Sequence, residues 1–149
     1  MDMDRKSRIL VFVALFALVM SVGLVAHGLT AANAVTLEFW SGFSGDDRDA
    51  MGKLVDQFNR SQDEIKINWT TYQWDQLNSK LITGAAIGNV PDVVAMWATV
   101  VPEMVSKGVL SDLGKLATAA GIEKSDFLPE AWKLGNIKGR QYGVPLDLH

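Results

Sequence analysis

The sequence contains no cysteine and only two histidines among its 149 residues. Without cysteine these residues form no disulfide, no cysteine-based zinc site and no lipid-modified cysteine at a cleavage site. His27 precedes the first regular pattern and His149 is the last residue. A Ser-His-Asp arrangement therefore has almost no base available, and hydrolytic chemistry has little support.

Nucleotide and nucleic-acid signals are also missing. The glycines fit neither G-x-G-x-x-G, G-x-x-x-x-G-K-[ST] nor G-x-S-x-G, which removes the common nucleotide and esterase motifs. The formal net charge is −3, whereas nucleic-acid binding needs a basic stripe. The acidic residues Asp46, Asp47 and Asp49 fall at an expected helix start, where they complement the helix dipole. We expect no nucleic-acid partner, no metal and no cofactor.

The amino terminus has the pattern of an export signal. Basic residues at 5–8 precede an apolar run at 9–20, and the small residues Ala32-Asn33-Ala34 follow. This pattern predicts a signal peptide over residues 1–34, cleaved after Ala34. The alternative is an uncleaved membrane anchor, because residues 9–26 are about long enough to span a bilayer. In that case the chain would be a membrane-anchored sensor domain.

Hydrophobic periodicity after residue 34 alternates between strand and helix. Period-two alternation predicts strands at 35–40 and 65–69, and helical spacing predicts helices at 46–59 and 77–85. The apolar run at 93–97 is typical of a parallel strand buried on both faces. A further helix would follow this run. The order β-α-β-α-β-α favours a parallel sheet with right-handed crossovers.

Local signals suggest where these elements begin and end. Ser44 with Asp47 resembles a capping box, and Thr99 is placed to cap the helix after the third strand. Residues 125–134 favour another helix, and residues 142–146 a fourth strand, which the chain enters after a turn at 138–140. Because the sequence then stops in mid-element, we expect a partial sequence.

Four segments together resemble the extracellular solute-binding proteins of ATP-driven sugar importers, in the branch that includes maltose- and glycerol-phosphate-binding proteins. They are residues 39–45 (FWSGFSG), 77–94, 108–113 (GVLSDL) and 139–147 (GRQYGVPLD). The resemblance implies an α/β fold, namely a type II periplasmic-binding-protein lobe with an open, mostly parallel sheet flanked by helices. Residues 35–149 would be the first part of the N-terminal lobe, and a second lobe would complete the protein.

A sugar site needs aromatic platforms and planar polar groups. By the family pattern these groups come from the loops after the strands and from the hinge strand. The implied ligand-binding residues are Trp40, Ser41, Gly42, Phe43, Ser44, Tyr72, Gln73, Trp97, Asp147 and His149. Trp40 and Trp97 would end neighbouring strands as platforms, although a core role is the alternative for each. Trp69 and Trp132 are assigned to packing.

The residues after the first strand carry no acidic side chain, unlike the maltose binders. Their amides at a helix start could instead receive a phosphate, so both a carbohydrate and a polyol-phosphate ligand stay open. The resemblance implies a non-enzymatic, monomeric importer subunit in the periplasm that docks on membrane permease subunits. The alternative from another class is an exported α/β hydrolase or transferase.

Cleavage after Ala34 gives the first prediction. Amino-terminal sequencing of the exported protein should begin at Val35, because the small residues at 32 and 34 satisfy the signal peptidase rule. A mature species found in the membrane fraction with residues 9–25 retained would contradict it and would favour the sensor alternative.

Overall fold

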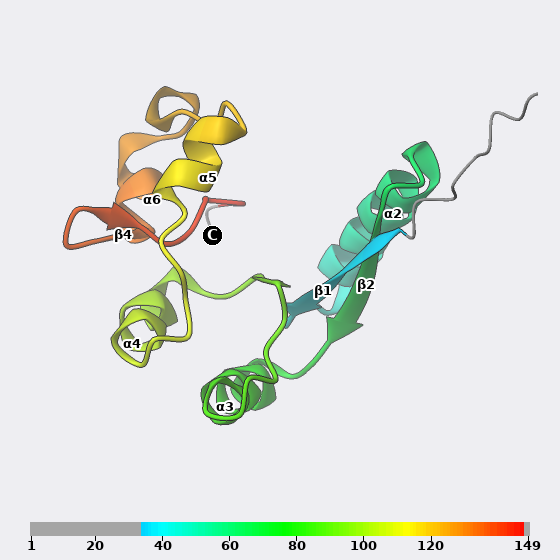
Figure 1. The fold of residues 1–149 in the computed structure, drawn as a ribbon, viewed down its shortest axis with the longest axis horizontal. Helices are drawn as coiled ribbons and strands as arrows, with labels where there is room; N and C mark the ends of the chain where they lie inside the picture. The colour runs from blue at the N-terminus through cyan, green and yellow to red at the C-terminus, as the bar shows by residue number, and fades with distance from the viewer. Residues whose placement is uncertain (1–33, 148–149) are drawn as a thin grey trace, which may run out of the picture. The chain divides into compact units, whose positions relative to one another are not determined.

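Strand β1 (Val35–Ser41) is the centre of the sheet. The computed structural model describes residues 34–147. In it β1 pairs in parallel with β2 (Ile65–Thr71) on one side (Figure 1) and with β3 (Val93–Val94) on the other. The register places Val35 beside Ile65 and Trp40 beside Val94. The parallel sheet and its order, β2-β1-β3, agree with the predicted βαβ succession.

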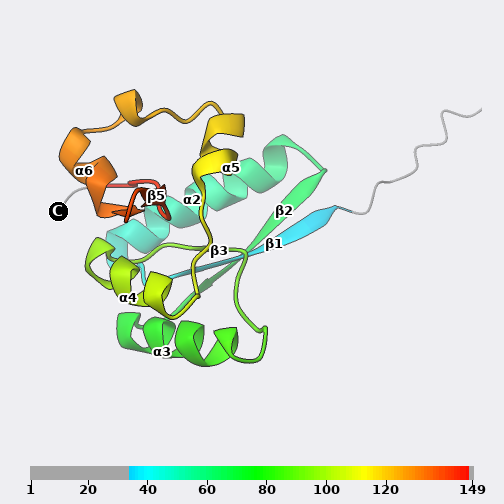
Figure 2. The same ribbon diagram turned by 60° about the vertical axis from the view of Figure 1, so that its left-hand side comes forward.

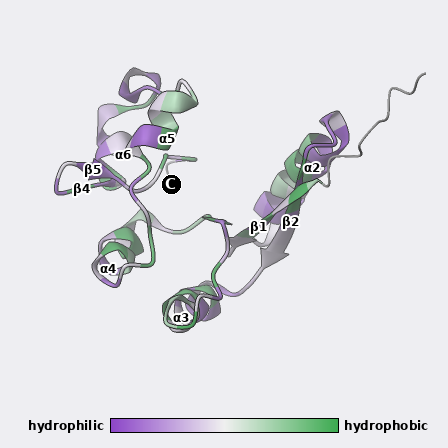
Figure 3. Ribbon diagram, in the orientation of Figure 1, coloured by the Kyte–Doolittle hydropathy of each residue, from purple (hydrophilic) through white to green (hydrophobic). Residues whose placement is uncertain are grey.

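Helices cover the two faces of this sheet. Helix α2 (Gly45–Ser61) packs on β2 over the face that carries Phe39 and Trp69. Helices α3 (Trp74–Ala85) and α4 (Val101–Ser106) pack on the opposite face, against Trp40. Figure 2 shows α2 and α3 on different sides of β1 and β2, and in Figure 3 both helices mix hydrophobic and hydrophilic turns. Helix α3 buries Leu77 and Leu81 against its face of the sheet, as an amphipathic helix does. Helix α2 buries only Val55 and leaves Leu54 and Phe58 exposed, although all three were predicted to lie on its apolar face.

The core lies under α3 and α4. Leu77, Leu81 and Met104 are fully or almost fully buried and form one cluster. Trp40 and Val94, from β1 and β3, pack partly buried against it. The expected periodicity of the helix at 77–85 is confirmed, since its apolar positions are those that reach the sheet.

The rest of the described chain consists of short elements. These are α5 (Gly114–Ala119), the 3-10 turn η2 (Lys124–Asp126), α6 (Pro129–Leu134) and an antiparallel hairpin of β4 (Asn136–Ile137) with β5 (Arg140–Gln141). Lys138 and Gly139 both have positive φ, 51° and 82°, as a two-residue type I′ hairpin turn requires. The predicted turn is correct, but the hairpin around it was not predicted.

Two strand predictions are wrong. The third strand contains only Val93 and Val94, and Val93 is 48% exposed, so the run at 93–97 is not a strand buried on both faces. Val93 lies on the face of Phe39, where α2 covers β2 instead. No strand forms at 142–147 either. The backbone there bonds locally, since the N–H of Tyr142 donates to the carbonyl of Gly135 at 2.8 Å.

The helix starts also differ from expectation. Ser44 does occupy the N-cap position of α2, but its side chain makes no capping hydrogen bond. Thr99 caps nothing, because it lies inside the 3-10 turn η1 (Ala98–Val100) that leads into α4. Residues 125–134 divide into η2 and α6 instead of forming one helix. The residue at which a helix begins depends on the backbone conformation there, and the type of side chain alone does not determine that conformation.

Within residues 34–147 no helix is long and apolar enough to cross a membrane. The predicted signal peptide lies outside the described residues except for Ala34, as does the alternative membrane anchor.

The core gives a stability prediction. Leu77→Ala should lower the free energy of unfolding by about 2–5 kcal/mol, because it empties a completely buried site on α3. Leu116→Ala on α5 is the matched control: Leu116 is 67% exposed, and its loss should change stability by no more than about 0.5 kcal/mol. Denaturant unfolding of the two variants measures both values. Equal effects would contradict this placement of the core.

Candidate functional site

Three loops leave the sheet at the same edge. Because the strands are parallel, the chain emerges there as residues 42–44 after β1, 72–73 after β2 and 95–97 after β3. Backbone hydrogen bonds continue past the strands, from Tyr72 N–H to the carbonyl of Ser41 and from Ala95 N–H to the carbonyl of Trp40, each 2.9 Å. Ligands of open α/β sheets bind at this carboxyl edge.

An aromatic cluster of Phe43, Trp74 and Trp97 gathers at this edge. The rings of Phe43 and Trp74 meet edge to face, with centroids 6.1 Å apart and planes at 88°. Trp74 and Trp97 lie 5.1 Å apart with a 33° tilt. Trp97 is 55% exposed, so the cluster presents an indole to solvent. Such a ring is suited to stack on the C–H face of a sugar.

A second aromatic pair lies deeper. Trp40 meets Tyr72 edge to face at 5.2 Å, and both rings pack partly buried on the core cluster. The ammonium of Lys80 lies 5.1 Å from the centre of the Tyr72 ring, within range of a cation–π contact. Trp40 thus combines a packing role with its position at the strand end.

Ser41 faces the interior. It is completely buried, and its Oγ accepts a 2.9 Å hydrogen bond from the indole Nε1–H of Trp69. Trp69 also stacks on Phe39, with centroids 6.2 Å apart and planes at 20°. The packing role predicted for Trp69 is confirmed, and the Ser41 hydroxyl is used inside the fold.

Gly42 and Trp74 lie against each other. Gly42 is buried, and a Cβ built on it would overlap the indole of Trp74. Trp74 therefore holds together the loops after β1 and β3, although it was absent from the predicted site residues. The sequence did carry a signal, since Trp74 directly follows Tyr72 and Gln73 at the end of a strand.

The other predicted site residues occupy helix starts and the carboxyl end. Ser44 and Gln73 are exposed N-cap residues of α2 and α3. Asp147 is exposed and is the last residue described, and His149 lies outside the described residues. Trp132, assigned to packing, does pack on Phe127, with centroids 5.3 Å apart.

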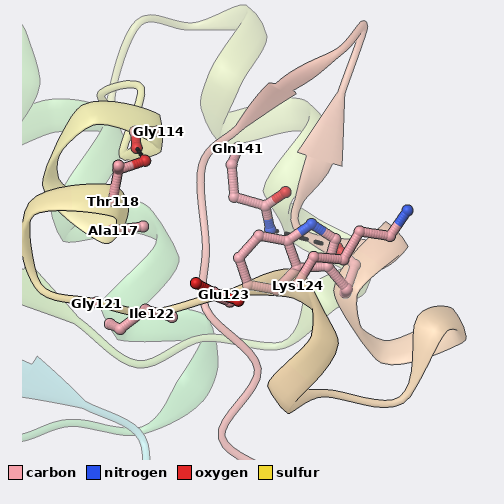
Figure 4. A pocket seen from close by; sticks show the side chains of 9 residues that line it. Gly114, Ala117, Thr118, Gly121, Ile122, Glu123, Lys124 and Gln141 are labelled. Carbon is pink, nitrogen blue, oxygen red and sulfur yellow. Dashed lines mark hydrogen bonds between the residues drawn. The ribbon is translucent and has the colours of Figure 1, made fainter.

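A separate hollow of ≈ 380 Å³ lies between α5, η2, α6 and β5. Figure 4 shows Thr118 across from Gln141 and Lys124. The buried Gln141 amide is already bonded: its Nε2 donates to the carbonyls of Trp132 and Gly143, at 3.3 and 2.6 Å. Thr118 Oγ1 donates to the backbone of its own helix. Most polar groups of the hollow therefore stabilise the local fold.

No cluster of three or more potential metal ligands occurs among residues 34–147. The site at the sheet edge is accordingly made of aromatic rings, exposed polar side chains and backbone amides.

A family model places this chain among known proteins. Residues 44–149 match the family described as bacterial extracellular solute-binding protein. The chain belongs to this family. Its match begins at the loop after β1 and includes all the later elements, so the solute-binding architecture accounts for most of the described fold.

Relatives agree with the family. An uncharacterized lipoprotein of Streptomyces antibioticus is 28% identical over 89% of this chain and 29% of the relative. An uncharacterized ABC transporter extracellular-binding protein of Pyrococcus horikoshii is 28% identical over 74% of this chain and 26% of the relative. The chain therefore spans less than a third of the length of these relatives.

A solved structure has the same fold. The maltotriose-binding protein of Thermus thermophilus, bound with maltotriose, superposes with a TM-score of 0.64 and 27% identity, over 73% of this chain and 28% of that chain. This similarity confirms the fold class, an α/β lobe of the type II periplasmic-binding-protein kind. The predicted resemblance to the solute-binding family is also confirmed. The family description and the names of the Pyrococcus horikoshii and Thermus thermophilus proteins are those of binding proteins, in agreement with the expected non-enzymatic role.

Two serines of this solute-binding lobe give a matched test. Ser41→Ala should destabilise the protein by about 1–3 kcal/mol, because it leaves the indole N–H of Trp69 without its acceptor. Ser44→Ala should change stability by less than about 0.5 kcal/mol, since Ser44 is exposed and its side chain makes no cap bond. Thermal melts of both variants decide between a structural and a surface role. A stable Ser41→Ala variant would contradict the interior assignment.

Proposed function

We propose that this chain forms the first part of the N-terminal lobe of a sugar-capturing subunit of an ATP-driven importer. A second lobe would close over the ligand, and the closed form would dock on membrane permease subunits. The subunit performs no chemistry on its ligand. The observation that carries the proposal is the exposed indole of Trp97, supported by Trp74, at the carboxyl edge of the sheet.

A carbohydrate is the ligand that this surface fits best. A sugar ring offers an apolar C–H face for an indole and hydroxyl groups for polar side chains. Phe43 and Trp97 supply rings, and the exposed Ser44 and Gln73 supply polar groups beside them. The maltotriose complex of the Thermus thermophilus neighbour supports an oligosaccharide.

A polyol phosphate is the second candidate ligand. Residues 41–44 contain no acidic side chain, and the α2 backbone amides at this point are not capped by Ser44. Helix amino termini attract anions. Asp46 and Asp47 in the first turn of α2 oppose that attraction, so the uncharged carbohydrate is favoured.

Exposed apolar side chains support completion of the lobe by further chain. Val93 on the third strand and Leu146 near the carboxyl end are 48% and 64% exposed. Large apolar side chains on the strands of an α/β domain, and close to them, are normally covered by other parts of the protein. We propose that residues of the same polypeptide beyond this sequence cover them.

The proposed place of action is the periplasm. Residues 1–34 would be removed on export, and the protein would act as a monomer. The Streptomyces antibioticus relative is named a lipoprotein, but this sequence contains no cysteine to carry a lipid. We therefore propose that the protein is not a lipoprotein.

Replacing each of two tryptophans tests the ligand site. Trp97→Ala in the intact gene product should weaken sugar binding by roughly 1–3 kcal/mol, because it removes a stacking surface. Its melting temperature should change little, since the ring is largely exposed. Trp40→Ala is the comparison: its ring packs on the core, so it should lose roughly 2–4 kcal/mol of stability.

Calorimetric titration with maltotriose and with glycerol 3-phosphate, and a melt of each variant, measures these effects. Binding of glycerol 3-phosphate alone would select the second candidate ligand. Normal affinity in a clearly destabilised Trp97→Ala variant would end the platform assignment.

A further inference from the structure

The backbone of Gly42 leaves no free space above the indole of Trp74. A Cβ at position 42 would overlap Cδ2, Cε3 and Cε2 of that indole at once. Proximity to these three ring atoms means that the Cβ would sit over the flat face of the ring. Gly42 does not have a φ in the left-handed region, so backbone conformation does not require glycine here. Glycine is required because the indole of Trp74 occupies the space that a side chain would need.

Trp74 in turn contacts Trp97. Their centroids lie 5.1 Å apart, and Phe43 abuts Trp74 with its ring at 88°. Trp74 is thus bounded by the backbone of residue 42, by a perpendicular phenyl ring and by a second indole. Packed rings of this kind have few alternative positions, because interiors are close-packed.

Trp97 has much less support of its own. It lies beyond the two-residue strand β3, at the N-cap of η1, and more than half of it is exposed. Among the described residues, Trp74 is the ring that contacts it. The orientation of an exposed indole on a short loop therefore depends on the ring beneath it.

We propose that Gly42 and Trp74 act together as positioning residues for Trp97. Because residue 42 has no side chain, the indole of Trp74 can pack directly against the backbone after β1. Trp74 in turn fixes the position and the tilt of the Trp97 ring that contacts the ligand. In this arrangement Trp74 supports the platform without touching the ligand. The consequence for binding rests on the proposed sugar-binding function, but the effect on Trp97 does not.

Gly42→Ala in the intact gene product is the direct test, and Gly84→Ala is its control. Both glycines are buried, and a Cβ at either would overlap a neighbour. At Gly84 that neighbour is the backbone carbonyl of Asn89 and not one of the aromatic rings of the candidate site. Both variants should lose stability, but only Gly42→Ala should move Trp97.

The position of Trp97 can be followed without any ligand. Fluorine NMR of 5-fluorotryptophan-labelled protein reports it, with the Trp97 resonance assigned by its loss in Trp97→Phe. Gly42→Ala and Trp74→Ala should each shift this resonance and change its broadening by a soluble nitroxide, whereas Gly84→Ala should leave both unchanged. An unshifted Trp97 resonance in folded Gly42→Ala and Trp74→Ala would overturn the proposal.

Binding then gives a double-mutant cycle with maltotriose as the probe. Gly42→Ala should weaken affinity about tenfold, which corresponds to about 1.4 kcal/mol, while Gly84→Ala keeps the original affinity. In a Trp74→Ala background, Gly42→Ala should weaken the affinity no further, because the indole that the new methyl group would displace is already absent. A full additional loss there would show that residue 42 acts directly on the ligand and would overturn the positioning role.

The two proposals fail in different ways. If the Trp97 resonance shifts as expected but neither maltotriose nor glycerol 3-phosphate binds the original protein, the positioning role stands and the proposed function fails. If a sugar binds and the resonance stays fixed, the proposed function stands and the positioning role fails.

Discussion

The pairing of β1 on both sides is the constraint on which the rest of the structure depends. Parallel registers with β2 and β3 bring the carboxyl ends of all three strands to one edge. Each ring of the cluster formed by Phe43, Trp74 and Trp97 follows one of these ends or begins the next helix. Residues 43, 74 and 97, far apart in the sequence, meet only because β1 holds the strands together.

The strand alternation also divides neighbouring residues between different tasks. Trp40 points to the face covered by α3 and α4 and packs on the core, whereas Ser41 points to the α2 face and accepts a hydrogen bond from Trp69. The site consequently begins at Gly42, one residue beyond the strand. A one-residue change in register would exchange these faces.

Two regions of the molecule that could receive a ligand differ in chemistry. The hollow beside α5 is lined by polar groups that already bond within the fold, such as the Gln141 amide. At the sheet edge, by contrast, an indole is exposed and the polar residues at the helix starts make no cap bonds. The exposed indole and the uncapped helix starts are therefore both found at the strand ends.

The alternation of strands and helices and the parallel sheet were predictable from the sequence, because hydrophobic period and turn residues are local features. The family was predictable only from the resemblance of four short segments, among them residues 39–45 and 139–147. The short length of β3 and the absence of a strand at 142–147 depend on tertiary structure. An extended run becomes a strand only where a neighbouring segment offers hydrogen-bond partners. The same holds for the site. The apolar run at 93–97 predicted Trp97 at a strand end, and the ring in fact lies three residues beyond the short strand β3. The contact of Trp74 with the backbone of Gly42 joins residues that are distant in the sequence, so only the packed fold brings them together.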